Sequence, residues 1–364
     1  MVVNSKFISS DGKVQKFSDK NFQPAKAGDI LMVMSDLPNG KALAKTFMVP
    51  QADKYAVNQR VCILRAKRGV PAYFRYQLNR NVYFLGFDDG VQQTHLLNRI
   101  FLECPVVVPE TIEEQRAIAQ ALSDTDDLIV SLDALIAKKR DIKQGAMQQL
   151  LSGKRRLPGL SGEWKGKRVG DLAACMRGVT YKGDGDLRES ANSHTRMLLR
   201  SNNIYEGKLT FQDVQHVVCE RVKDSQLLQA GDILLCMANG SKALVGKSAL
   251  VDADYPNLTF GAFMGCLRPH NRQDGAFLHS LFQTQAYRMQ IADALSGSSI
   301  NNLSPKQIEG LSFLLPDAAE RVEIANYLQA FERDEGAHRE QRAKVIAIRQ
   351  GMMQQLLTGS IRLI

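Results

Sequence analysis

The chain has 364 residues, of which 44% are hydrophobic, so it is long enough to bury more than one core, and we expect two domains with connecting segments. It has no apolar run near the ~18–20 residues of a membrane span, and its first residues lack the apolar stretch of a signal peptide. Its six cysteines are scattered without a Cys-x-x-Cys pair, which predicts reduced thiols in the cytoplasm and no zinc site. The net charge of +9 suggests a polyanionic partner, although an ordinary basic surface stays open.

Residues 1–110, which we call the first lobe, are expected to form short strands and turns. Residues 27–33 predict a turn that enters a buried strand, and residues 60–65 predict an exposed strand. Residues 72–85 interleave aromatic and arginine side chains. These side chains either stack on bases or form a core helix with a basic outer face, and the residues favour the core helix. A polar loop at 88–96 and an apolar strand at 101–108 complete the expected lobe.

Residues 111–157 form the first predicted helical region. A short helix should run to about Leu122, a new N-cap should lie within residues 123–126, and a long helix should follow to about Leu151. The apolar positions of the long helix have coiled-coil spacing, and Gly153 suits the position just beyond a helix C-terminus. A second lobe at 158–316 and a second helical region at 317–364 follow.

The second half of the chain repeats the first. Residues 114–157 align without a gap with residues 320–363, and 17 of the 44 positions are identical. Because polar residues interrupt the apolar seam of the second helical region, the two regions should pair best through their C-terminal halves and their short first helices. The lobes repeat each other too, since residues 27–31 match 230–234 and the loop at 90–96 matches 297–303. Residues 163–199 have no counterpart in the first lobe.

The sequence shows no recognisable catalytic or cofactor motif. Residues 240–248 resemble a phosphate-binding loop, but five residues separate the two glycines where the motif has four. No dinucleotide-binding glycine pattern and no metal-ligand spacing occurs, and the motif of an adenine methyltransferase is missing. We therefore expect a chain that is not an enzyme and that holds no metal and no cofactor.

Three stretches carry a resemblance to a known family. They read PETIEEQRAIAQAL at 109–122, KQGAMQQLLSGKRRL at 143–157 and GEWKGKRVGDLA at 162–173, and the signature at 143–153 returns at 349–359. Together with the layout they resemble the specificity subunit of type I restriction-modification systems. The resemblance implies an α+β fold: two mixed α/β target-recognition lobes separated by two long antiparallel helices that form a coiled coil, with a pseudo-twofold internal repeat. The shortened first lobe departs from the family pattern.

The resemblance also implies partners and a role. Each lobe would read one half of a split site in double-stranded DNA, and the helices would dock two methyltransferase subunits. Those subunits would bind S-adenosylmethionine and methylate adenine, and motor and endonuclease subunits would join for restriction. A helix over residues 126–151 would be about 39 Å long. One turn of DNA is about 34–36 Å, so the helices suit a spacer between the lobes.

Polar loop residues are the candidates for base contacts, because amide side chains pair well with adenine. They are Gln92, Gln93 and His95 in the first lobe, and Ser298, Asn301 and Asn302 in the second. Basic residues are the candidates for phosphate contacts, namely Lys41, Arg60, Arg65, Arg200, Lys242 and Lys247. Two alternatives stay open: a coiled-coil adaptor that assembles partner proteins without reading DNA, and an enzyme with an unrecognised site.

Overall fold

The computed structural model describes residues 1–20, 23–296 and 301–363. The chain divides into two compact units. Unit 1 comprises Met1–Leu135 and His338–Ile364, and unit 2 comprises Ile136–Ala337. Each unit therefore contains one lobe and part of each helical region.

The core of unit 1 is a small antiparallel sheet in the order β4-β2-β6. Its strands are β2 (Ile30–Val33), β4 (Thr46–Met48) and β6 (Val61–Leu64). All four side chains of the central strand β2 are buried, as its uninterrupted apolar sequence predicts. Two short pairs complete the strands of unit 1: β1 (Val2–Val3) with β5 (Ala56–Val57), and β3 (Ser35–Asp36) with β7 (Thr94–His95). The predictions of strands within 27–33 and 60–65 are confirmed.

The helices of this lobe are short. They are α1 (Ser5–Ser9), α2 (Pro71–Leu78), α3 (Val82–Leu85) and α4 (Asn98–Glu103). Tyr73, Tyr76 and Phe84 are buried, so these aromatic side chains form core rather than a base-stacking surface. The predicted strand at 101–108 is wrong, because α4 occupies its first residues and, among the described residues, 105–108 pair with no strand.

Unit 2 has a larger set of strands around the same plan. Its main sheet has the order β16-β15-β18-β9, with β9 (Ala173–Arg177), β15 (Ile233–Cys236), β16 (Ser248–Leu250) and β18 (Met264–Pro269). A second sheet joins β10 (Leu187–Arg188), β14 (Gln215–Val218), β11 (Thr195–Leu199) and β17 (Leu258–Phe260). The remaining pairs are β12 (Ile204–Tyr205) with β13 (Lys208–Leu209), and β8 (Lys165–Arg168) with β19 (Ser312–Leu315). The shorter helices are α6 (Gly183–Asp186), α7 (Asp274–Leu281), α8 (Gln285–Ala294) and α9 (Pro305–Glu309).

The internal repeat extends to single hydrogen bonds. In unit 1 the Asp29 carboxylate binds the Arg65 guanidinium through two bonds of 2.6 and 2.7 Å. In unit 2 the Asp232 carboxylate binds Arg268 in the same way, at 2.9 and 2.7 Å. Each arginine lies 36 positions after its aspartate. Each aspartate lies immediately before an inner strand of its sheet, β2 or β15, so the same ion pair links equivalent strands in both lobes.

Backbone hydrogen bonds that recur in both lobes show where the first lobe is shorter than the second. Asn58 N donates to Val3 O (3.0 Å), and Gly261 N donates to Leu199 O (2.9 Å), so β1 corresponds to the end of β11. Lys45 N bonds Ala42 O as Lys247 N bonds Leu244 O, which places Lys45 with Lys247. Residues 41–43 and 242–244 have the same sequence, Lys-Ala-Leu, and the sequence alone matches them directly; these bonds instead place 41–43 with 243–245, one residue later.

The two helical regions are single long helices, α5 (Ile112–Leu150) and α10 (Ala318–Leu356). The predicted break within residues 123–126 is wrong. The Thr125 hydroxyl donates to Leu122 O (2.8 Å), a bond within α5. The Asp126 carboxylate accepts a hydrogen bond from the Tyr76 hydroxyl of the lobe (2.8 Å). Neither side chain therefore caps a new helix. Gly153 has a positive φ of 70° just beyond α5, which confirms its predicted capping position.

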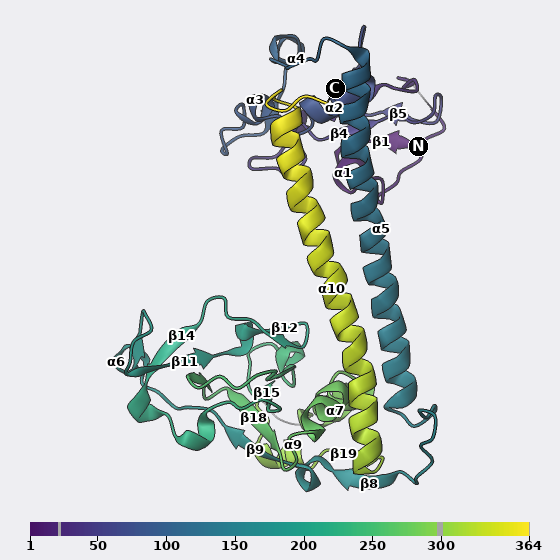
Figure 1. The fold of residues 1–364 in the computed structure, drawn as a ribbon. Coiled ribbons are helices and arrows are strands. Elements are labelled where there is room, and N and C mark those ends of the chain that lie inside the picture. Colours follow the sequence, from purple (N-terminus) through teal and green to yellow (C-terminus); the bar gives the residue numbers. More distant parts are fainter. Residues whose placement is uncertain (21–22, 297–300, 364) are drawn as a thin grey trace. The chain divides into compact units, whose positions relative to one another are not determined.

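Within each unit the two helices run in opposite directions (Figure 1). In unit 1, Asp126 pairs with Arg349 and Asp133 pairs with Arg342, so the residue numbers increase along α5 as they decrease along α10. In unit 2, the pairs Lys139–Asp334 and Lys143–Glu332 follow the same rule. The polar part of α10 thus faces α5 through ion pairs, while apolar side chains join the helices nearer their ends. Those apolar residues are Ile118, Leu122, Met352 and Leu356 in unit 1, and Met147, Leu150, Ile324 and Leu328 in unit 2.

Candidate nucleic-acid interface

In the first lobe, a polar loop follows the central strand. Asp36 is the last residue of β3, and its carboxylate accepts hydrogen bonds from the backbone N–H groups of Ala42 (2.7 Å) and Leu43 (3.1 Å). This pairing folds residues 36–43 into a compact loop with Lys41 exposed on it. The loop therefore presents a cation from a fixed backbone position.

The polar loop at 88–96 lies next to β3 and the 36–43 loop. The Asp89 carboxylate accepts bonds from Val91 N (2.9 Å) and Gln92 N (3.0 Å), which hold the pKa of Asp89 below its ordinary value. Gln92 and His95 are exposed, whereas the Gln93 amide donates to the Ser35 hydroxyl (2.8 Å). Gln93 thus joins the loop to β3.

The Asn39 amide donates to Gly90 O (3.3 Å), which ties the 36–43 loop to the 88–96 loop. Lys41, Gln92 and His95 consequently lie on two joined loops of the first lobe. We call these loops the first polar cluster.

The predicted basic residues of β6 lie at opposite ends of the strand. Arg60 is exposed, and its carbonyl accepts a bond from Met34 N (3.0 Å), so it lies at the end where β2 leads into the first polar cluster. Arg65 lies at the other end, where it binds Asp29 and keeps the pKa of that carboxyl low. The structure therefore brings Arg60 toward the candidate interface and uses Arg65 in an ion pair within the lobe.

In the second lobe three loops meet in a corresponding cluster. The Asn239 side chain donates to the Ser201 hydroxyl (3.2 Å), and Asn239 N donates to Asn301 O (3.2 Å). The Asn301 amide in turn donates to Gly240 O (3.1 Å). Asn302 is exposed and accepts a bond from the Arg177 guanidinium (2.7 Å). These loops form the second polar cluster, and Ser298 lies outside the described residues.

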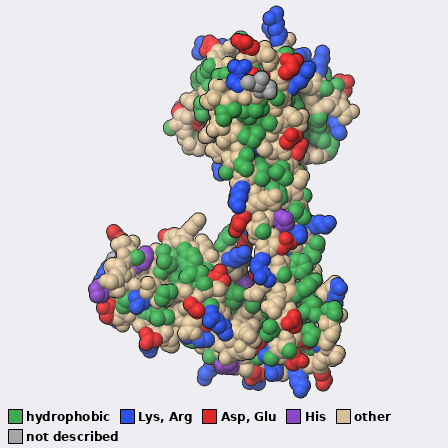
Figure 2. Space-filling view, in the orientation of Figure 1, with side chains coloured by type: hydrophobic (Ala, Val, Ile, Leu, Met, Phe, Trp, Pro, Cys, Tyr) green, Lys and Arg blue, Asp and Glu red, His purple; other side chains and the backbone are tan. Residues whose placement is uncertain are grey.

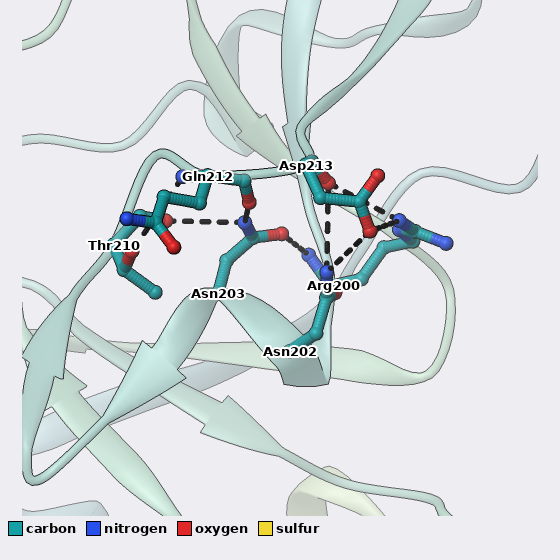
Figure 3. A network of polar contacts seen from close by, with 6 residues as sticks. All are labelled: Arg200, Asn202, Asn203, Thr210, Gln212 and Asp213. Atoms are coloured by element: carbon teal, nitrogen blue, oxygen red, sulfur yellow. Dashed lines mark hydrogen bonds and ion pairs between the residues drawn. The ribbon is translucent and has the colours of Figure 1, made fainter. Parts of the chain in front are cut away.

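Next to this cluster is a network built on Arg200 (Figure 3). The Arg200 guanidinium and the Asn202 amide both donate to Asp213, at 3.2 and 3.1 Å. The buried Asn203 side chain accepts from Arg200 N (2.9 Å) and donates to the carbonyls of Thr210 and Gln212. Arg200 is thus half-buried and paired, so it orders a loop as well as supplying charge.

Lys242 and Lys247 differ in exposure. Lys242 is exposed in a turn after Asn239, while Lys247 is half-buried beside the end of β15. Sequence reasoning did not select Asn39, Asn202, Asp213 or Asn239. The Asn239-Gly240 pair is a turn signal that would have indicated one of them.

Charge is dispersed on the face of the molecule shown in Figure 2, where lysine and arginine side chains are mixed with acidic and neutral ones. Among residues 1–20, 23–296 and 301–363, no group of three or more His, Cys, Asp or Glu is arranged to hold a metal ion. Within the same residues, no helix combines the length and apolarity that a membrane crossing requires. All six cysteines are free.

The two polar clusters occupy equivalent positions. Ser35 pairs with His95 across β3 and β7, and Ala238 forms a bridge with Asn302. Immediately after each pair, Leu96 N bonds Met34 O and Leu303 N bonds Met237 O, both at 2.8 Å. His95 and Asn302 are therefore counterparts, as the sequence match of the two loops predicted.

Comparison with known proteins places this arrangement in a family. A family model described as the type I restriction modification DNA specificity domain matches residues 161–346, just over half of the chain. The chain belongs to this family. Its match covers all of β8 to β19 and most of α10, so the second lobe of this specificity protein and the helix that follows it are the matched parts.

Two curated relatives show the same similarity. The specificity subunit of the type I restriction enzyme EcoKI from Escherichia coli strain K12 is 33% identical over 165 residues. The StySPI specificity subunit from Salmonella potsdam is also 33% identical over 165 residues. Each match covers 45% of this chain and 35% of the relative, so the matched part spans about a third of the length of these two relatives.

A solved structure agrees over almost the whole chain. The type I restriction-modification S subunit from M. genitalium has a TM-score of 0.60 with this chain at 14% identity. The similarity covers 98% of this chain and 91% of that one. The specificity-subunit fold, with its α+β lobes and paired long helices, is thus shown for both units.

Proposed function

We propose that this chain is the sequence-recognition subunit of a type I restriction-modification enzyme and reads a bipartite site in double-stranded DNA. The observation that carries the proposal is the equivalence of the two polar clusters. His95 and Asn302 occupy the same position in two copies of one lobe, and each is exposed beside a lysine-bearing loop. A site of two separated halves requires two such readers.

Within the polar clusters, exposed amide and imidazole groups are suited to base edges and lysines to phosphates. We assign base contacts to Gln92, His95, Asn301 and Asn302, with Ser298 and Gln93 as further candidates from the sequence. We assign phosphate contacts first to Lys41, Arg60 and Lys242, because each is exposed at a cluster. Lys247 and Arg200 are half-buried, and Arg65 is held by Asp29, so these three rank lower.

The helix pair supplies the remaining role. We propose that α5 and α10 dock two methyltransferase subunits, with motor and endonuclease subunits joining in the full complex. S-adenosylmethionine and the methylation of adenine N6 belong to those partners, and this chain acts in the cytoplasm without a reaction or cofactor of its own. Support comes from the family match and from the signature at residues 143–153 and 349–359, which lies at the end of each helix.

Co-expression with the methyltransferase of the same system, followed by mapping of modified adenines, tests the proposal. The expected result is one motif with two specified halves and an unspecified spacer. Exchange of residues 158–316 for the second lobe of a related subunit should change one half and leave the other. A continuous motif contradicts bipartite reading. Complex assembly without any DNA binding or modified adenine favours the adaptor alternative.

A further inference from the structure

One exposed aromatic side chain lies beside the second polar cluster. Phe263 belongs to the turn of residues 261–264 between β17 and β18, in which Met264 N donates to Gly261 O (2.8 Å). Its ring is 71% exposed, so the fold buries little of it. A phenylalanine stabilises a fold through the apolar surface that it buries, and this ring buries little. The role of Phe263 therefore lies outside the core.

The first lobe has an equivalent turn at residues 58–61, before β6. There Val61 N donates to Asn58 O (2.9 Å), which is the same closing bond as in the second lobe. Arg60 occupies the third position of this turn, where the turn of the second lobe has Phe263. Because the closing bond forms with a cation at this position in one lobe and an aromatic ring in the other, the turn does not depend on either side chain.

Two further observations show that the two positions correspond. Arg60 lies five residues before Arg65, and Phe263 lies five residues before Arg268. The two later arginines form the equivalent ion pairs described above. The carbonyls of Arg60 and Phe263 also accept a bond from the segment that follows the inner strand, β2 or β15, at 3.0 and 2.9 Å. One backbone position thus carries different chemistry in the two lobes.

Phe263 lies close to Asn302, a proposed base contact. The Phe263 carbonyl accepts hydrogen bonds from Met237 N (2.9 Å) and Ala238 N (3.0 Å). Ala238 forms a bridge with Asn302 on its other side. Two strand spacings amount to about 10 Å, or roughly three base-pair steps of 3.4 Å. The exposed ring and the exposed amide are therefore close enough to serve one half-site.

The chemistry of DNA leaves few partners for an aromatic ring at this place. Phosphate oxygens and most atoms of the base edges are polar, and a phenylalanine side chain has no donor or acceptor for them. The apolar group that a base edge displays in the major groove is the 5-methyl group of thymine. We propose that Phe263 contacts this methyl group and makes one position of the second lobe's half-site specific for an A·T pair. The inference rests on the proposed function, which places DNA against the second polar cluster.

The equivalent turns help one fold to read two different half-sites. Arg60 supplies a charge that suits a phosphate, and Phe263 supplies an apolar surface that suits one base. The first polar cluster has exposed apolar side chains at other positions, namely Leu37 at 66% and Val91 at 77% exposure. Each lobe therefore places its apolar groups differently, as two unlike half-sites require.

A protein partner is a less suitable occupant for this ring. Surfaces that bind proteins gather apolar side chains into a patch. The loops beside Phe263 instead carry the amide side chains of Asn239, Asn301 and Asn302. Amide groups around one apolar ring match a base edge, where a methyl group lies among donors and acceptors.

The test measures how the complex of this chain with its methyltransferase binds duplexes that carry the mapped motif. Each thymine of the second half-site is replaced in turn by deoxyuridine, which pairs with adenine in the same way and lacks only the 5-methyl group. With the natural chain, one replacement should weaken binding about fourfold, the effect of leaving one methyl group unburied. The variant Phe263→Ala should bind the thymine and uracil duplexes equally, with the affinity that the natural chain has for uracil.

Two further variants and two further measurements make the result specific. Phe17 of the first lobe is 74% exposed, so Phe17→Ala removes a similar ring and should keep the discrimination at the second half-site. Phe263→Leu keeps an apolar side chain and should retain part of the discrimination. Because the ring is exposed, Phe263→Ala should unfold at the same urea concentration as the natural chain. It should also bind DNA that lacks the motif equally well, since the phosphate contacts are unchanged.

Tolerance of uracil at every thymine of the second half-site overturns the proposal, and so does discrimination that survives Phe263→Ala. A loss of affinity for DNA without the motif, or a loss of the methyltransferase from the Phe263→Ala complex, assigns the ring another role and also overturns it. A complex that binds no DNA overturns the proposed function and this inference together. Uracil tolerance in a complex with a bipartite motif overturns this inference alone.

Discussion

A buried ion pair at the start of α10 offers a quantitative test of how the second lobe is joined to its helix. The Arg321 guanidinium binds the Asp274 carboxylate at 2.7 and 3.1 Å and donates to Pro316 O at 3.0 Å. The two side chains are only 7% and 4% exposed. The pair thus links the first turns of α10 and α7 away from water.

The variant Arg321→Met replaces the guanidinium with an unbranched apolar side chain and leaves the Asp274 charge buried without its partner. Breaking a buried pair in this way costs about 3–5 kcal/mol, and the low exposure of both groups means that solvent screens little of it. For a unit of this size, each kcal/mol changes the Tm by about 2–4 °C. We expect the transition of unit 2 to fall by about 10 °C.

Trp164 makes the measurement specific. It is the only tryptophan of the chain, it lies in unit 2, and its indole N–H donates to Glu320 (3.3 Å). Urea unfolding followed by tryptophan fluorescence therefore reports unit 2. The control is Arg272→Met, because Arg272 and Asp254 form a pair at 3.1 Å that is 63% and 65% exposed. Such a pair contributes about 0–1 kcal/mol.

The double variant Arg321→Met with Asp274→Ala should be more stable than Arg321→Met alone, because no buried charge remains. The first lobe shows that this joint can form without an ion pair. There Gln115 takes the place of Arg321, accepting from Val70 N and donating to Pro109 O, both at 3.0 Å. If Arg321→Met unfolds at the same urea concentration as Arg272→Met, the reasoning from burial is refuted.

Three further predictions concern DNA binding and pH. Lys242→Ala should weaken binding to every sequence and lower the salt slope by about 0.9, whereas Lys165→Ala on β8 should not; equal slopes in a filter-binding titration contradict the phosphate contact. A heptad inserted after Ala137, with a matched heptad after Ala337, adds about 10.5 Å of helix and should lengthen the unread spacer by about 3 base pairs. An unchanged spacer in the mapped motif rejects the helices as its ruler. Burial lowers the pKa of His279 from 6.5 to about 4. The folded chain therefore keeps His279 neutral where the unfolded chain protonates it, and unit 2 should lose about 3 kcal/mol between pH 7 and pH 4. The variant His279→Tyr has no imidazole to protonate, so its stability should not show this part of the decrease toward acid pH in fluorescence-detected unfolding.

Sequence reasoning succeeded where a pattern is local or repeated. The uninterrupted apolar run before Val33 identified β2, and Gly153 identified the end of α5. The match of the loops at 90–96 and 297–303 identified two equivalent positions, His95 and Asn302, although nothing in either loop alone indicates its place in the fold.

The errors arose where tertiary partners decide the conformation. Thr125 and Asp126 are common helix-capping residues, but a helix carbonyl and the Tyr76 hydroxyl satisfy their side chains, so α5 continues through them. Residues 105–108 have the apolar sequence of a strand, yet a strand needs a partner; β19 pairs with β8, and in the described part of the first lobe no strand pairs with 105–108. Arg65 looks like a free surface cation until Asp29 is placed beside it.

The ion pairs of the helix ends explain why neither half of the sequence describes a unit by itself. Glu114 at the start of α5 binds Arg362, which lies beyond the end of α10, at 2.6 Å. Glu320 at the start of α10 binds Arg156, which lies beyond the end of α5. All four residues are shifted by 206 positions between the repeats, and both glutamates are buried. Each repeat therefore supplies the arginine that pairs with the glutamate of the other repeat. Unit 1 needs Arg362 from the second repeat, and unit 2 needs Arg156 from the first repeat. A substitution such as Arg362→Met should accordingly destabilise the unit that contains the first lobe, although Arg362 lies 248 positions after its partner Glu114.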